Sequence, residues 1–202
     1  MPSINKEVDS IIQKIFGVNE DVNLTFTVDN SLTKNSLDGY TKFPGGSSFF
    51  FDSKIELNPW VLQNATKEYI LVTMLHEAIH SYIDYWYNQY LTKAIDSSTF
   101  KSKFPIFWNY KQILKDPVEI AQHNTMAENY ITTMKDAIKS YNPNATDTAA
   151  VALAWGGLQQ TTVWKTKSDT TNIINMNLNS RDATLNKFFT YNFQKCGGLL
   201  PQ

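Results

Sequence analysis

The sequence predicts a single α+β domain that is mostly helical and contains a small sheet. Strand-like alternation of apolar and polar residues occurs at 22–28 and near 49–57, whereas several later segments have apolar residues at helical spacing. The chain has 202 residues, of which 42% are hydrophobic, which suits one globular domain with one substantial core. We therefore expect one domain over 1–202, with its best-supported core at 49–140.

The N-terminal quarter contains one predicted helix and two predicted strands. Apolar residues at helical spacing predict a helix over 4–16 that ends at Gly17. The alternating run at 22–28 predicts a half-buried strand. Residues 29–48 are rich in Asn, Ser, Lys and Gly and predict a loop or a loose hairpin, which leads to a second strand at 49–57.

A long helix follows the second strand. Asn58 as N-cap and Pro59 as first helical residue predict a short helical turn. Asn64 or Thr66 can cap the next helix, which is expected at about 66–91. The apolar residues on its inner face are Ile70, Leu71, Met74, Leu75, Ala78, Ile79, Tyr82, Ile83 and Trp86. Because so much of its circumference is apolar, this helix is expected to run through the core.

Capping residues, and the glycines and prolines that end helices, predict the remaining elements. Residues 92–115 are mixed, and the aromatic cluster at 104–108 either fills the core or lines a pocket. The run Asp116-Pro117-Val118-Glu119 has the form of a capping box and predicts a helix to about Ser140. Thr146 or Asp147 caps an Ala-rich helix that breaks at Gly156-Gly157, and the tail at 165–202 is polar and predicts no clear element.

Composition excludes several classes of protein. The 18 basic and 19 acidic residues give a net charge of −1, and Arg181 is the single arginine, so nucleic-acid binding is disfavoured. Cys196 is the single cysteine and excludes an internal disulfide and a multi-cysteine zinc ribbon. No run is apolar enough for a membrane span. No signal peptide is visible, which favours a cytoplasmic location, although an exported protein without its leader has the same pattern.

The chemistry of the chain is concentrated at Leu75-His76-Glu77-Ala78-Ile79-His80, which contains HExxH. On a helix, His76 and His80 are one turn apart on the same face, so both imidazoles can point at one zinc ion. Glu77 then lies beside a water held by the metal and can act as general base. With three His and seven Glu in the chain, chance predicts about 0.0015 matches to this pattern.

A catalytic zinc site needs a third protein ligand, and the sequence offers few candidates. His123 is the remaining histidine and lies in the helix expected after Asp116. A histidine packed on a helix face would be the ordinary interpretation, but a zinc site that lacks one ligand favours the metal role. Glu128 and Glu119 are the alternatives, because a carboxylate is the other common third ligand.

HExxH on a core helix, a strand before it and a third ligand on a later helix resemble the zincin metallopeptidases, most closely the SprT-like group. The resemblance covers about 49–131 and implies zinc held by His76, His80 and His123, with Glu77 as catalytic base. It also implies a sheet edge over the zinc cleft, at 49–57, where an extended peptide pairs. His123 follows His80 by 43 residues, a longer gap than in the most compact zincins, and the chain lacks the cysteine-rich ribbon that some SprT-like proteins use on DNA.

Three further features are candidates for supporting roles. Asp84, four residues after His80, can orient the His80 imidazole or be a solvated residue of the helix face. Tyr130 can stabilise an oxyanion or serve as an aromatic core residue. The Trp155-Gly156-Gly157-Leu158 run predicts a tight packed turn in which glycine serves backbone geometry.

The pattern supports two functional hypotheses. The first is a zinc-dependent metallopeptidase, an endopeptidase acting on a peptide or protein substrate, in which Glu77 activates the zinc-bound water. The second is a non-catalytic protein on a zincin scaffold that binds a partner peptide or uses zinc structurally. Glu77 counts against the second hypothesis, because a purely structural site has no use for a carboxylate beside an open coordination position. The sequence does not identify the substrate or the oligomeric state.

Overall fold

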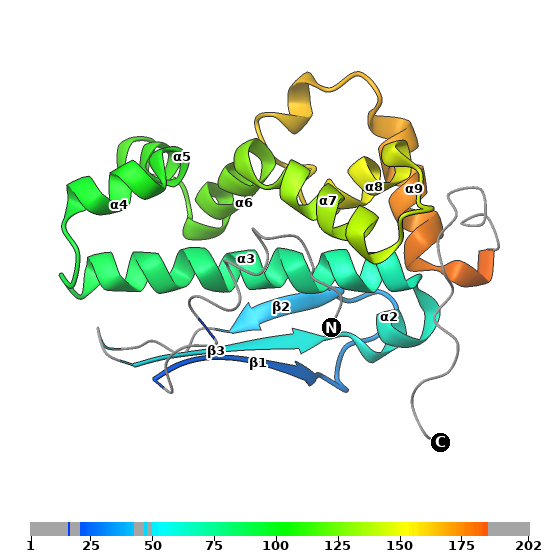
Figure 1. The fold of residues 1–202 in the computed structure, drawn as a ribbon, viewed down its shortest axis with the longest axis horizontal. Coiled ribbons are helices and arrows are strands. Elements are labelled where there is room, and N and C mark those ends of the chain that lie inside the picture. The colour runs from blue at the N-terminus through cyan, green and yellow to red at the C-terminus, as the bar shows by residue number, and fades with distance from the viewer. Residues whose placement is uncertain (1–15, 17–20, 43–46, 48–49, 186–202) are drawn as a thin grey trace.

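The computed structural model describes residue 16, residues 21–42, residue 47 and residues 50–185 (Figure 1). Within these ranges the protein is α+β and mostly helical, with one small sheet, as the sequence predicts. Apart from Phe16, the helix expected at 4–16 lies outside the described residues, and so does Cys196.

The sheet has three strands in the order β1-β3-β2. β1 (Val22–Val28) pairs in parallel with β3 (Phe51–Leu57), and β2 (Gly39–Lys42) pairs antiparallel with the other side of β3. The expectation that 49–57 forms the edge of the sheet is therefore wrong. β3 is the central strand, and five of its seven residues are buried, which suits a strand with neighbours on both sides.

The edge strand next to the helices is β2, which lies within the segment expected to be a loop or a loose hairpin. Its pairing with β3 places Thr41 opposite Ile55 and Gly39 opposite Leu57. Because β2 has only four residues, its alternation of apolar and polar side chains is too short to be recognised from the sequence.

The helix that carries HExxH is confirmed almost residue for residue. Thr66 caps α3 (Lys67–Leu91) by accepting a hydrogen bond from the Tyr69 amide. Before it, Asn58 caps the short α2 (Pro59–Asn64), also as expected. Figure 1 shows α3 lying between the sheet and the layer formed by the helices that follow it in the chain. Its apolar residues contact both layers, and Ile83 at its centre is fully buried.

The segment after α3 forms α4 (Ser97–Lys103), α5 (Pro105–Trp108) and a π-helical turn at Asn109–Ile113. Its aromatic cluster fills the core, with Phe104 and Phe107 fully buried against α3 residues such as Tyr87. Of the two interpretations of this cluster, core filling is the one that the fold supports.

The helix expected from Asp116 to about Ser140 is two helices, α6 (Val118–Asn129) and α7 (Ile131–Tyr141). The backbone breaks at Tyr130, which has φ −118° and ψ −2°. The capping box is also absent, because Pro117 occupies the N-cap position and provides no side-chain hydrogen bond. Capping patterns predicted the start of the helix, whereas the break has no glycine or proline to mark it.

The C-terminal helices complete the layer over α3. Thr146 caps α8 (Asp147–Ala154), as expected, and the chain then turns at the two glycines. A short 3₁₀ turn at Trp164–Thr166 precedes α9 (Thr170–Arg181), which the sequence did not predict, and a 3₁₀ turn at Ala183–Leu185 follows. None of the described helices combines the length and the hydrophobicity that crossing a membrane requires.

Candidate metal centre

α3 presents the HExxH residues on its face toward the outer helices. His76 and His80 are one turn apart, and their Nε2 atoms lie 3.2 Å from each other. Of the residues between them, Ala78 and Ile79 are 1% and 3% exposed and pack in the core. The helix is held in the core by its apolar residues, so the two imidazoles have a fixed direction.

α6 brings the third histidine to the same point. The Nε2 atom of His123 lies 3.1 Å from that of His80, and ligand atoms of all three histidines lie within 4.8 Å of one another. Within the described ranges, these histidines form the group that can hold a metal ion. The expected convergence of His76, His80 and His123 is thus found. The alternative ligands Glu119 and Glu128 are both exposed and lie outside this group, although Glu119 lines the adjacent cleft.

Burial keeps the three imidazoles neutral. It lowers the pKa of His76 well below the usual value, and it lowers that of His80 to about 3, with a further contribution from His123. Burial also lowers the pKa of His123. At neutral pH each ring therefore has a nitrogen lone pair to offer, which is the form that binds a metal.

Glu77 follows His76 on α3 and lines the same cleft as the histidines, with only 8% of its surface exposed. Burial raises the pKa of its carboxyl to about 7, while a hydrogen bond from Thr41 acts in the opposite direction. The Thr41 hydroxyl lies 2.8 Å from Glu77 Oε2 and 3.0 Å from the Glu77 backbone oxygen. Sequence reasoning missed Thr41, because its segment was expected to be a loop or a loose hairpin.

Asp84 does not contact His80 directly. Gln122 lies between them, with its Oε1 2.9 Å from His80 Nδ1 and its Nε2 donating to Asp84 Oδ1 at 2.7 Å. Asp84 is half-buried, and burial raises the pKa of its carboxyl to about 7, so it is not a solvated residue of the helix face. Nothing in the sequence indicated Gln122, because its contacts depend on how α3 and α6 pack.

The turn after α8 closes one wall of the centre. Gly157 has φ +76°, and a Cβ atom added there would lie 3.1 Å from His76 Cε1. Glycine therefore serves backbone geometry, as expected, and also makes room for His76. Tyr130 ends α6, packs against the hydrophobic core and is not among the residues that line the cleft, so no oxyanion role is supported.

The histidines open into a cleft of about 1030 Å³. One wall is β2 with the segment that precedes it, and the floor is α3. The opposite wall comes from α6, the glycine turn and α9. These elements line the cleft with residues that include Gly39, Thr41, Thr73, Glu119, Gln159 and Leu178. The cleft is therefore bordered along one side by the edge strand of the sheet.

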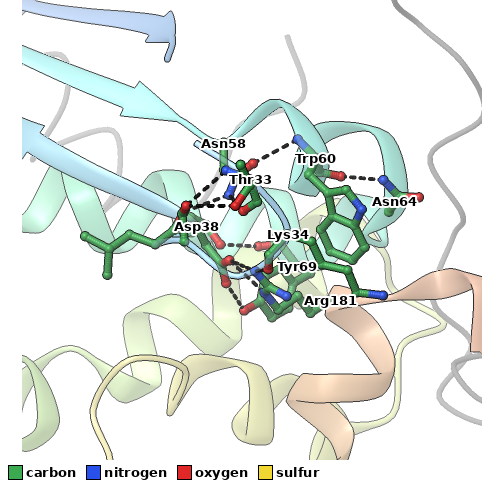
Figure 2. A network of polar contacts seen from close by, with 11 residues as sticks. Thr33, Lys34, Asp38, Asn58, Trp60, Asn64, Tyr69 and Arg181 are labelled. Atoms are coloured by element: carbon green, nitrogen blue, oxygen red, sulfur yellow. Dashed lines mark hydrogen bonds and ion pairs between the residues drawn. The ribbon is translucent and has the colours of Figure 1, made fainter. Parts of the chain in front are cut away.

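The segment that leads into β2 is anchored to α3 and α9 by the network in Figure 2. Asp38 accepts hydrogen bonds from Arg181 Nε at 2.7 Å and from the Tyr69 hydroxyl at 2.6 Å. Arg181 also donates to the Lys34 backbone oxygen at 2.7 Å, and the Asn58 amide donates to two further backbone oxygens of the segment. The single arginine of the chain thus holds one wall of the cleft in place.

Comparisons of this chain with protein-family models, with curated proteins and with solved structures find no match. A function is therefore inferred from the residues of the centre and the cleft. These residues provide three neutral imidazoles that converge, a buried carboxyl in the same cleft and an edge strand along that cleft.

Proposed function

We propose that the chain is a zinc metallopeptidase of the zincin type. The observation that carries the proposal is the convergence of the His76, His80 and His123 Nε2 atoms in an open cleft that Glu77 also lines. Histidine nitrogens are preferred ligands of zinc, and catalytic zinc sites use three protein ligands and keep one position free.

The spacing of the histidines fits this metal. Ligand nitrogens at about 2.0–2.1 Å from a tetrahedral zinc ion lie about 3.3 Å apart. The Nε2 atom of His80 lies 3.2 Å from that of His76 and 3.1 Å from that of His123, so a small movement accommodates the ion. His80 also has a hydrogen-bond partner on its other ring nitrogen, as ligating histidines in proteins usually do.

Zinc, when bound, supplies a Lewis acid that polarises a carbonyl and makes water more acidic. In the proposed reaction Glu77 takes a proton from the attacking water and delivers it to the nitrogen of the leaving amine. A buried carboxyl whose pKa is about 7 is suited to both steps near neutral pH. The Thr41 hydroxyl donates to one carboxylate oxygen, Oε2, and so helps to fix the direction of the carboxylate.

A peptide substrate is proposed to bind along β2 rather than along 49–57. β3 has partners on both sides, whereas β2 pairs with β3 on one side and borders the cleft on the other. An extended peptide can add to such an edge through backbone hydrogen bonds. Because Thr41 is on β2 and contacts Glu77, a peptide bound there would lie close to the proposed base.

Replacement of Glu77 by Gln tests the proposal. The amide has nearly the same shape and cannot take a proton, so E77Q is expected to bind one zinc ion and to lose cleavage of an unfolded protein substrate. Undiminished cleavage by E77Q would overturn the peptidase assignment. Wild-type protein that binds zinc and cleaves nothing would favour the non-catalytic alternative, in which the scaffold binds a peptide or uses zinc structurally.

A further inference from the structure

A chain of hydrogen bonds on the Nδ1 side of His80 connects α3 to α6. His80 Nδ1 lies 2.9 Å from Gln122 Oε1, and Gln122 Nε2 donates to Asp84 Oδ1 at 2.7 Å. His80 and Gln122 are 9% and 4% exposed, so the contacts are largely protected from water. A buried hydrogen bond of this kind is costly to leave unmade.

The chemistry of the three groups fixes the direction of both hydrogen bonds. An ionised carboxylate only accepts, so the amide nitrogen of Gln122 faces Asp84 and the amide oxygen faces His80. That oxygen also only accepts, so the proton of the neutral His80 ring is on Nδ1. Nε2 of His80 then has a lone pair, and this is the nitrogen that faces His76 and His123.

We propose that Gln122 is a positioning residue that holds His80 in the metal-binding tautomer, and that Asp84 orients the Gln122 amide. A free imidazole favours the opposite tautomer, with the proton on Nε2, and that proton would point at the other two histidines. The hydrogen bond to Nδ1 decides which nitrogen is protonated. The proposal rests on the metal centre of the proposed function and does not require that the protein cleave peptides.

The placement of the three residues suits this role. His80 and Asp84 are one turn apart on α3 and present their side chains to the same side. Gln122 directly precedes His123 on α6. One residue of α6 thus contacts a ligand from α3 while the next is itself a ligand, so the chain of hydrogen bonds fixes the direction of His80 relative to His123.

Ring-nitrogen NMR on the metal-free protein tests the tautomer directly. At about pH 8, above the pKa of Asp84, we expect wild-type His80 to be protonated on Nδ1. Gln122→Met keeps the length of the side chain and removes the acceptor, so His80 is expected to move toward the Nε2-protonated form. Zinc affinity, measured by competition with a chelator, is expected to fall about 10- to 100-fold.

A double variant tests whether the hydrogen bonds, rather than the shape of the side chain, are responsible. Gln122→Glu combined with Asp84→Asn exchanges the carboxylate and the amide and keeps an acceptor for His80 Nδ1. This pair is expected to restore the Nδ1 tautomer and to bring zinc affinity to within a few-fold of wild type. Because the tautomer is read without metal or substrate, failure of the peptidase proposal would not change this result.

A second buried amide side chain on α6 provides the control for a general loss of fold stability. Asn124 is 2% exposed, and its side chain forms hydrogen bonds with the Ile120 oxygen and the Thr162 amide rather than with a histidine. Asn124→Leu is expected to lower the melting temperature while leaving the His80 tautomer unchanged. An Nε2-protonated His80 in the wild type, or an unchanged tautomer and zinc affinity in Gln122→Met, would overturn the proposal.

Discussion

The hydroxyl of Thr41 on β2 lies 2.8 Å from the carboxylate of Glu77 on α3 and donates a hydrogen bond to it. The two residues are 36 positions apart in the sequence. The contact joins the edge strand of the sheet to the proposed catalytic base. It limits the rotation of the carboxylate, and it stabilises the charged form against the effect of burial.

Removal of the Thr41 hydroxyl is expected to slow catalysis without loss of metal. Thr41→Val keeps the shape of the side chain and suits a strand, so the fold and zinc affinity should be retained. A hydrogen bond to a charged group contributes about 1.5–3 kcal/mol, so kcat should fall about 10-fold or more. Steady-state assays with a peptide substrate check this. Thr41→Ser should retain most activity, and a wild-type kcat for Thr41→Val would show that Thr41 does not position the base.

Gly157 is expected to be essential for metal affinity. Alanine at this position would adopt φ +76°, which costs about 1–2 kcal/mol, and its Cβ would lie 3.1 Å from His76 Cε1. His76 must then move, so we expect zinc to bind about 10-fold more weakly in Gly157→Ala. Chelator competition measures the affinity, and urea unfolding measures the stability.

Gly156 provides the matched control for this substitution. A Cβ atom at Gly156 would lie 2.9 Å from Asn177 Oδ1 and away from the histidines. Gly156→Ala should therefore destabilise the fold and leave zinc affinity nearly unchanged. Equal losses of zinc affinity in the two variants would mean that the turn acts through overall stability rather than through His76.

Substitutions of Glu119 and Glu128 should show whether Glu119 affects zinc affinity through its charge or as a direct ligand. Both are exposed on α6, but Glu119 lines the cleft and Glu128 does not. Glu119→Gln removes a negative charge near His123, so zinc affinity should fall about two- to fivefold at low salt and less at high salt. Glu128→Gln should have no effect. A loss of several orders of magnitude in Glu119→Gln would instead identify Glu119 as a ligand.

Local patterns allowed the centre of the site to be predicted from the sequence. The spacing of His76 and His80 fixes their relation on any helix, and Thr66 marks the start of that helix. His123 was predicted because few residues were available to complete a zinc site, and α6 does bring it to the other two. The prediction of His76 and His80 required only the geometry of a helix, and that of His123 required only the small number of candidate ligands; neither required knowledge of how the elements pack.

The parts that were missed depend on packing between distant segments. The central position of β3 follows from its pairing with both β1 and β2, which no local pattern specifies. α9 was missed because its buried face includes Asn177 and Ser180, so its apolar residues do not follow a clear helical period. Gln122 and Thr41 were missed for the same kind of reason, since each acts through a contact with a residue on another element.

The edge strand β2 is held in place by a group of charged side chains, and the stability that they provide should depend on pH. Glu56 on β3 lies 2.7 Å from Lys42 Nζ and 2.7 Å from Lys54 Nζ, and it also accepts a hydrogen bond from the Tyr40 hydroxyl. These partners, with Lys42 the largest contributor, lower the pKa of Glu56 from 4.5 to about 2. Because Lys42 and Tyr40 are on β2, the charge of Glu56 helps to hold β2 against β3.

We expect Glu56→Gln to lose stability above pH 4.5 and to approach wild type in acid. A carboxyl whose pKa is lower in the folded than in the unfolded protein stabilises the fold above the unfolded value of 4.5, and this contribution disappears as the pH falls toward 2. Urea unfolding of the metal-free proteins from about pH 6 to pH 2 measures the difference, with Glu128→Gln as the control. A difference between wild type and Glu56→Gln that stays constant with pH would show that packing, rather than charge, accounts for the effect.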